Sequence, residues 1–288
     1  MKKPYILLLL VITMASLYSC SSESSSEPML IIKFKFDPNQ ARLNNLGQPS
    51  IIPAGNAAQS PIFNTLGSHY IELSPNANTQ LGQGTIVYHG AETTIGGGNA
   101  IDFSKEKIVA QDEVFLKIPL SQVTAGSYEW VRVSLAYQNY QINVRNAGVD
   151  YAGTLASFVG FNTYLTTFNI GNNIFPVNGN RAQGYWAFGL NDQPYSKSGQ
   201  ADPGATTVPN PINSTSPIPL NSCVVTGKFA TNLVIDGTET RDVTVTLSLS
   251  INHSFEWHEV NADGKYEPSV GENVVDMGLR GLIPTYVK

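Results

Sequence analysis

Near the C-terminus, the stretch EVNADGKYEPSVGENVVD starts at Glu259 and places carboxylate and amide oxygens at every second position before a glycine. A calcium loop needs oxygen ligands at positions 1, 3 and 5, a glycine at 6, a backbone carbonyl at 7 and a carboxylate near 12. With Glu259 at position 1, Val270 falls at position 12, and the nearest carboxylate follows two residues later. The spacing predicts a calcium site formed by Glu259, Asn261, Asp263, Lys265 through its carbonyl, Glu267 and Glu272.

The same stretch also fits a tight turn that holds no metal. Asp263-Gly264 between two runs favours a type I′ hairpin, because both central residues of that turn need positive φ. Trp257 and Tyr266 would then be cross-strand partners. The sequence leaves both interpretations open.

The four histidines, His69, His89, His253 and His258, offer a second route to a metal. In HSFEWH, an extended chain points His253 and His258 to opposite faces, because successive side chains of a strand alternate. A local transition-metal chelate would therefore pair Glu256 with His258. Its third ligand would come from His69 or His89.

Sequence patterns for catalysis are missing from the chain, which has no GxSxG, HExxH, Walker or dinucleotide-binding glycine motif. A glycosidase can be built from distant carboxylates such as Asp102, Glu106, Asp112 and Glu113, but any β-protein offers such pairs. We therefore expect a binding or structural module, with a secreted hydrolase acting on glycans as the alternative.

The N-terminal segment predicts the compartment. Two lysines, an apolar run over 6–14 and small residues before Cys20 predict a signal peptide over 1–19, since the run is too short to span a bilayer. Leu17-Tyr18-Ser19-Cys20 resembles the bacterial lipobox, which implies that Cys20 carries a lipid. The segment 20–28 then forms a flexible tether. We expect an outer-membrane lipoprotein on the periplasmic or cell-surface face, with residues 29–288 as one β-sandwich domain.

Composition narrows the class of protein further. Charged residues make up 14% of the chain and the formal net charge is −5, which argues against nucleic acid as a partner. A lipid on Cys20 leaves Cys223 without a disulfide partner, and its apolar surroundings in SCVVTGKF predict a buried side chain. Abundant glycine and proline indicate many turns between short strands.

Alternating apolar residues predict the strands. In MLIIKFKF, residues 32, 34 and 36 share one face, and in RDVTVTLSLSI residues 243 to 251 alternate in the same way. EVFLKIPL and SYEWVRVSLAYQ are expected to pair around the turn signal at 124–126. Repeated short strands of this kind predict an all-β fold, an antiparallel β-sandwich with long loops. Shorter candidates are HYIEL, TIVYHG, GYWAFGL and CVVTGKF.

Two further segments depart from simple alternation. Residues 154–171 are apolar on nearly every side and are interpreted as a strand pair or a buried crossover. Residues 191–221 are rich in Pro, Asn, Ser and Gly, and we expect a long loop there, either an insertion or a flap facing a ligand.

The aromatic residues of GYWAFG also allow two interpretations. Tyr185, Trp186 and Phe188 have the rings that stack on an exposed glycan. The alternative, which we favour, is that all three pack into the core.

The order of these features resembles that of a group of Bacteroidota lipoproteins. It is carried by IKFKF after the tether, AIDFSK, TAGSYEWVRVSLAYQNY, TGKF and VNADGKYEP followed by VVDMGLRGLIP. The phrase AGSYEWVRVSL is also similar to a strand of MbnP-like proteins, a β-sandwich family in which some members bind copper. That resemblance implies a β-sandwich and copper as a cofactor. It assigns no ligand to Trp130, Trp186 or Trp257.

Overall fold

The computed structural model describes residues 27–44, 46–201, 216 and 218–288. Their regular structure is β throughout, apart from three short 3-10 turns, which confirms the all-β prediction. No helix in the described ranges is both long and apolar enough for a membrane crossing. The predicted signal peptide, Cys20 and most of the tether lie outside the described residues. The 3-10 turns are η1 (Phe103–Lys105), η2 (Leu120–Gln122) and η3 (Pro268–Val270).

The strands form four sheets. In strand order, the first sheet contains β19 (Leu282–Val287), β16 (Val243–Ser250), β1 (Met29–Asp37) and β8 (Val114–Pro119). The largest contains β14 (Ser196–Gln200), β13 (Tyr185–Leu190), β10 (Val149–Phe158), β9 (Gly126–Asn146), β3 (Ile62–Ser74) and β4 (Thr85–His89). Two more of its strands, β15 (Cys223–Ile235) and β7 (Ile108–Val109), pair with β9 and β3.

Two smaller sheets complete the fold. One contains β12 (Asn173–Ala182), β11 (Asn162–Ile170), β6 (Ala100–Asp102) and β5 (Glu92–Thr93). The other contains β18 (Val274–Met277), β17 (Phe255–His258) and β2 (Asn56–Gln59). Most pairs are antiparallel, whereas β1 with β16 and β6 with β11 are parallel.

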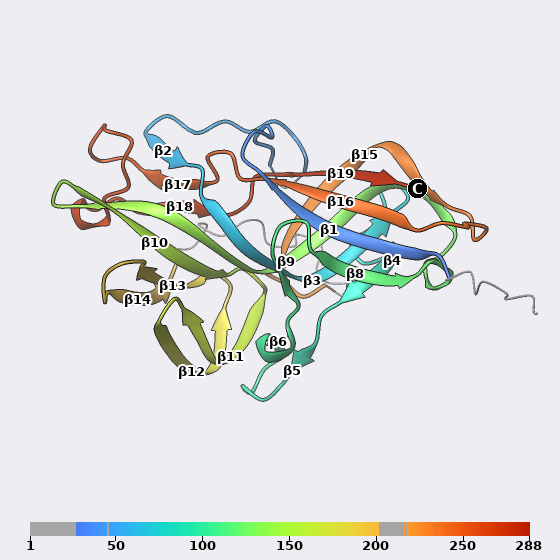
Figure 1. The fold of residues 1–288 in the computed structure, drawn as a ribbon, viewed down its shortest axis with the longest axis horizontal. Coiled ribbons are helices and arrows are strands. Elements are labelled where there is room, and N and C mark those ends of the chain that lie inside the picture. Colours follow the sequence, from blue (N-terminus) through green and yellow to red (C-terminus); the bar gives the residue numbers. More distant parts are fainter. Residues whose placement is uncertain (1–26, 45, 202–215, 217) are drawn as a thin grey trace, which may run out of the picture.

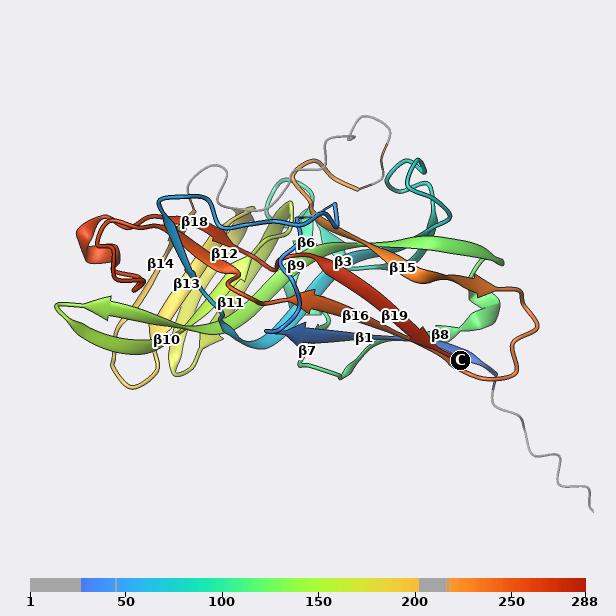
Figure 2. The same ribbon diagram turned by 90° about the horizontal axis from the view of Figure 1, so that it is seen from above.

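The eight-stranded sheet is the layer on which the other three pack. Its β9, β3 and β15 share an apolar core with β1 and β16, where the predicted inward residues of both strands are buried. Further along, Ala156 and Phe158 of β10 pack with β11, whereas Leu155 belongs to a cluster with β17 and β18. Figures 1 and 2 show the result, in which β1, β16 and β19 lie toward one end and the β9–β10 hairpin reaches the other.

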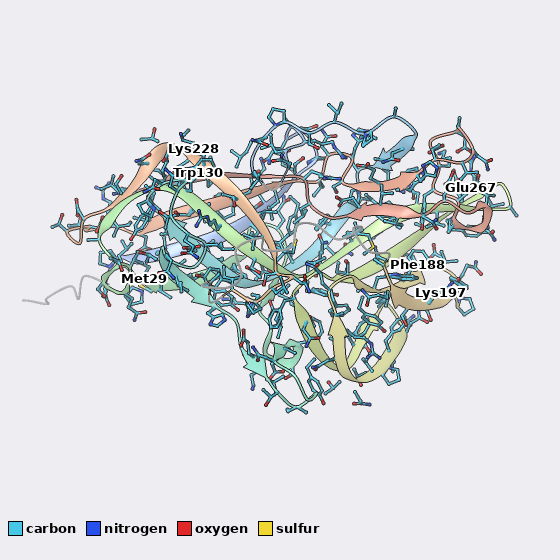
Figure 3. The ribbon with its side chains drawn as sticks, turned by 180° about the vertical axis from the view of Figure 1, so that it is seen from behind. Met29, Trp130, Phe188, Lys197, Lys228 and Glu267 are labelled. Atoms are coloured by element: carbon cyan, nitrogen blue, oxygen red, sulfur yellow. The ribbon has the colours of Figure 1, made fainter. Side chains whose placement is uncertain are left out.

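Strand β9 runs through both ends of the molecule and changes its pairing partners along its length. One edge pairs with β3, while the other pairs with β15 up to Leu135 and with β10 from Tyr137 onward. Ala136, between these two ladders, has no partner in the register with β3, so a β-bulge marks the change. Figure 3 shows the long axis of the molecule, with Trp130 of β9 and Lys228 of β15 in one half and Glu267 near the opposite end.

Three details of the sequence-based topology need correction, in whole or in part. Strands β8 and β9 do not pair with each other, because η2 carries the chain from the first sheet to the eight-stranded sheet. Of the two interpretations of residues 154–171, the strand pair is wrong because β10 and β11 belong to different sheets, and the crossover fits, because the chain passes there from one sheet to another with many of its residues buried. The expected long loop over 191–221 contains strand β14, which pairs with β13, while 202–215 and 217 lie outside the described residues. Local alternation identifies a strand but not its partner, which depends on residues far away in sequence.

Candidate metal centre

His69 occupies a bulged position in β3. Ser68 and Tyr70 pair with consecutive residues of β9, which leaves His69 as an extra residue without a cross-strand partner. Leu66 and Ile71 both face the core shared with β1, although residues five apart in a regular strand point to opposite faces. The bulge accounts for this change of face and re-aims the side chain of His69.

His89 and Glu92 approach His69 from the neighbouring edge. His89 ends β4 and is the cross-strand partner of Tyr70, and Glu92 begins β5 two residues beyond Gly90. The N–H of Gly90 donates a hydrogen bond of 2.7 Å to the carbonyl of His69. A Cβ at Gly90 would lie 3.5 Å from Cδ2 of His69, so the imidazole ring packs directly against this link.

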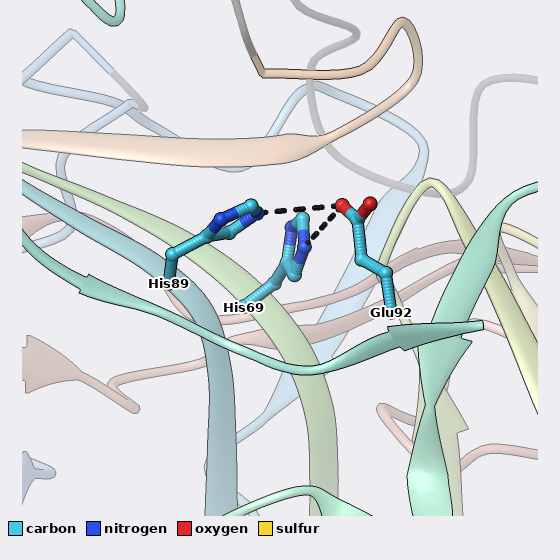
Figure 4. A group of neighbouring side chains, drawn as sticks. All are labelled: His69, His89 and Glu92. Carbon is cyan, nitrogen blue, oxygen red and sulfur yellow. Dashed lines mark hydrogen bonds and ion pairs between the residues drawn. The ribbon is translucent and has the colours of Figure 1, made fainter.

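One carboxylate oxygen of Glu92 faces both imidazoles (Figure 4). Oε1 lies 3.0 Å from Nε2 of His69 and 3.3 Å from Nε2 of His89. The two rings meet edge to face with centroids 4.9 Å apart. Among the described residues, this is the group of three His, Cys, Asp or Glu side chains whose ligand atoms all lie within 4.8 Å of one another.

The cluster lies at the boundary between protein and solvent. The side chain of His69 is 1% exposed, that of Glu92 26% and that of His89 50%. The hydrogen bond from His69 lowers the pKa of Glu92 to about 2, with further lowering by Asn99 and by both histidines, against the opposing effect of burial. Glu92 is therefore ionised at every physiological pH, the state that a metal ligand requires.

The distances from Oε1 of Glu92 to the two imidazole nitrogens suit a tetrahedral ion. With metal–nitrogen and metal–oxygen bonds of about 2.0–2.1 Å, neighbouring donors of a tetrahedron are about 3.3 Å apart. The two nitrogen–oxygen separations, 3.0 and 3.3 Å, are close to that value. Two imidazoles and a carboxylate form a donor set that transition metals accept.

One feature of His69 weakens the fit. Its Nδ1 is buried and has no hydrogen-bond partner among the described residues. A metal on Nε2 would place the ring proton on Nδ1, where ligating histidines usually have an acceptor. The site thus lacks part of the outer shell that strengthens metal binding.

The predicted calcium residues form a loop whose carboxylates already bind backbone donors. Oε1 of Glu259 accepts from the N–H groups of Asp263 and Gly264. Glu272 is buried, and it accepts from the N–H groups of Val260 and Asn261 through Oε1 and from that of Glu267 through Oε2. These bonds hold the loop together without an ion. The calcium site stays a prediction.

The remaining residues of this loop are placed as follows. The Asn261 amide donates to Glu267, and Lys265 extends toward Asp150 with Nζ 3.4 Å from Oδ2. The type I′ turn is wrong, because Gly264 has φ 68° while Asp263 is not among the residues with positive φ. Trp257 and Tyr266 are not cross-strand partners, because Trp257 pairs with Ala57 and Val274, but their rings contact each other with centroids 5.6 Å apart.

Glu256 and His258, the other predicted metal pair, have separate surroundings. Glu256 is buried, and its Oε2 lies 2.6 Å from Nη2 of Arg42 and 3.2 Å from Nη2 of Arg280. His258 is exposed at the end of β17. Neither belongs to a three-ligand group among the described residues. The guanidinium groups supply the positive charge that a metal would otherwise bring to Glu256.

The aromatic residues of β13 pack against the fold. Tyr185 is buried in the cluster with β11, whereas Trp186 and Phe188 are half-buried against the cluster with β17. A Cβ at Gly199 would lie 2.9 Å from the Trp186 ring, and Phe188 covers Gly153 in the same way. These two rings therefore fill space above glycines of neighbouring strands. Cys223 is buried, as predicted.

The pairing of His69 and His89 with Glu92 was missed by sequence reasoning, which used the two histidines only as distant partners of His258. The spacing His89-Gly90-Ala91-Glu92 was the available local signal. Nothing local indicated His69, because its orientation depends on the bulge in β3.

No protein-family model, curated protein or solved structure matches this chain. The functional argument therefore rests on the geometry of the site.

Proposed function

We propose that this protein is a lipid-anchored cell-envelope module that binds a divalent transition-metal ion through His69, His89 and Glu92. The observation that carries the proposal is the convergence of both Nε2 atoms on Oε1 of Glu92, at 3.0 and 3.3 Å. The anchor follows from the lipobox resemblance at Cys20. No described contact argues for glycan hydrolysis, which stays a prediction.

Zinc and copper are the ions to compare first. Nitrogen and oxygen donors of this kind accept both, and copper(II) binds more tightly than zinc at a given site. The unpartnered Nδ1 of His69 weakens binding, since loss of an outer-shell partner typically costs about 10- to 100-fold in affinity. We therefore expect a site that loads and releases its ion.

The test is a calorimetric titration of the purified protein with Zn²⁺ and, separately, with Cu²⁺. His89→Ala and Glu92→Gln alter partly exposed side chains, so the fold is expected to persist. Each should abolish the binding of one equivalent of metal. His258→Ala removes an exposed histidine away from the cluster and serves as the matched control. Unchanged binding in the first two variants, or loss in the third, would overturn the assignment.

A further inference from the structure

The two oxygens of Glu92 have different partners. Oε1 faces the imidazoles of His69 and His89, while Oε2 accepts a hydrogen bond of 2.7 Å from Nδ2 of Asn99. An ionised carboxylate can only accept, so the atom of Asn99 that faces it must be the amide nitrogen. The Asn99 amide thus donates to Oε2, the oxygen of Glu92 that neither histidine contacts.

Asn99 is held in place by the sheet that lies beyond it. It ends the turn between β5 and β6, and its carbonyl accepts a 2.9 Å hydrogen bond from Nδ2 of Asn162 in β11. The preceding carbonyl, that of Gly98, accepts a 3.2 Å bond from Nδ2 of Asn180 in β12. The turn is therefore bound to two strands that contribute no metal ligand themselves.

This arrangement limits how Glu92 can bind an ion. A carboxylate with one oxygen engaged by an amide offers the other oxygen alone, which is one-oxygen coordination. Zinc and similar ions accept a single carboxylate oxygen within a four-ligand shell. Calcium takes six to eight oxygen ligands and commonly uses both oxygens of a carboxylate.

We propose that Asn99 is a positioning residue that makes Glu92 a one-oxygen ligand and so selects zinc-like ions over calcium. This inference rests on the proposed metal site. Asn99 acts through Glu92 and does not touch the ion. Outer-shell contacts of this kind typically contribute about 10-fold or more to metal affinity.

The experiment compares wild-type protein with Asn99→Ala and Asn162→Ala. The second variant removes a hydrogen bond to the same turn but leaves the Asn99 amide intact, which makes it the matched control. Zn²⁺ affinity is measured by competition with a chelating dye, and the coordination of Co²⁺ by its visible absorption. Asn99→Ala should weaken Zn²⁺ binding about 10-fold and lower the Co²⁺ absorption, because Glu92 can then bind through both oxygens. Asn162→Ala should keep the four-coordinate Co²⁺ spectrum.

A further substitution at the same position, Asn99→Asp, keeps the test valid if Asn99→Ala fails to fold. Asn99→Asp has the same shape but places a carboxylate where the donor was, so the ratio of Zn²⁺ to Ca²⁺ affinity should fall. The inference is overturned if both Asn99 variants keep the wild-type spectrum and ion preference. If wild-type protein itself fails to bind Zn²⁺ and Co²⁺, the proposed function fails, which is a different result.

Discussion

Arg145 and Asp263 join the β9–β10 hairpin to the loop that the sequence marks as a calcium site. Nη1 of Arg145 lies 2.9 Å from Oδ2 of Asp263, and its Nε and Nη2 bind both oxygens of Asp150 at 2.6 and 3.1 Å. The backbone N–H of Arg145 donates to the carbonyl of Tyr266 in the same loop. A guanidinium group thus already pairs with the carboxylate of Asp263, one of the predicted calcium ligands.

Calcium is therefore expected to leave the melting temperature unchanged. A ligand at 100 times its Kd stabilises the folded state by about 2.7 kcal/mol, so a melt at about 10 mM calcium detects a Kd of about 0.1 mM. Asp263→Ala should lower the melting temperature by the same amount with calcium as with chelator. A calcium-dependent rise that disappears in this variant would instead establish the predicted ion loop.

Glu106 should make stability fall as pH rises. Burial raises the pKa of its carboxyl to about 8, and both of its oxygens are buried without a partner among the described residues. In the unfolded chain the pKa of glutamate is about 4.3, so between these values the folded state holds a proton that the unfolded state releases. The associated loss of stability is at most about 1.4 kcal/mol per pH unit.

The measurement for Glu106 is urea unfolding at about pH 5.5 and 7.5. Glu106→Gln keeps the shape of the protonated acid and removes the titration. Between these two pH values, the free energy of unfolding of the wild-type protein should fall by about 2 kcal/mol more than that of Glu106→Gln. If the free energy of unfolding changed with pH equally in both proteins, the carboxyl of Glu106 would not be neutral in the folded state.

Glu72 should be essential to the stability of the link between β3 and β4. Its fully buried carboxylate accepts from the N–H groups of Gly82 and Gly84 and lies 3.6 Å from Nη1 of Arg132. Glu72→Ala leaves a buried guanidinium unpaired and should cost about 3–5 kcal/mol, measured by urea unfolding. Glu113→Ala, at an exposed position, removes one solvent-exposed hydrogen bond from the Ala110 N–H and should cost no more than about 1 kcal/mol.

Gly281 should tolerate no side chain. It has φ 91°, and a Cβ there would lie 3.0 Å from Cγ and 3.1 Å from Cα of Leu43. Gly237 has φ 82°, and a Cβ there would have no atom within 4 Å. An alanine at this position would therefore cause backbone strain but no steric clash. Thermal unfolding should show a loss of about 1 kcal/mol for Gly237→Ala and about 2–4 kcal/mol for Gly281→Ala. Equal losses would show that Leu43 yields without cost.

Alternation predicted the individual strands well because the side-chain period of a strand is local. Val243, Val245, Leu247 and Leu249 are buried as expected, since a half-buried strand needs only its own residues to define its two faces. Pairing was less predictable. Strand β9 continues to Asn146, well beyond the predicted segment, and its three partners come from distant parts of the chain.

The candidate site was the least predictable part, for a related reason. Glu256 and His258 share a short motif, yet Glu256 is paired with two half-buried arginines, whereas His258 is exposed to solvent. His69 and Glu92 are 23 residues apart and belong to different sheets. Nothing in either local sequence states that their side chains meet.

The sequence by itself determined that the chain is all-β, which residues face inward along its main strands, and that Cys223 is buried. These properties depend on the hydrophobicity and spacing of neighbouring residues. Tertiary structure alone decided that an extra residue in β3 turns His69 toward His89 and Glu92, because a bulge is defined by the register between two strands. Strand pairing over long distances thus assembled the ligand set that local spacing did not reveal.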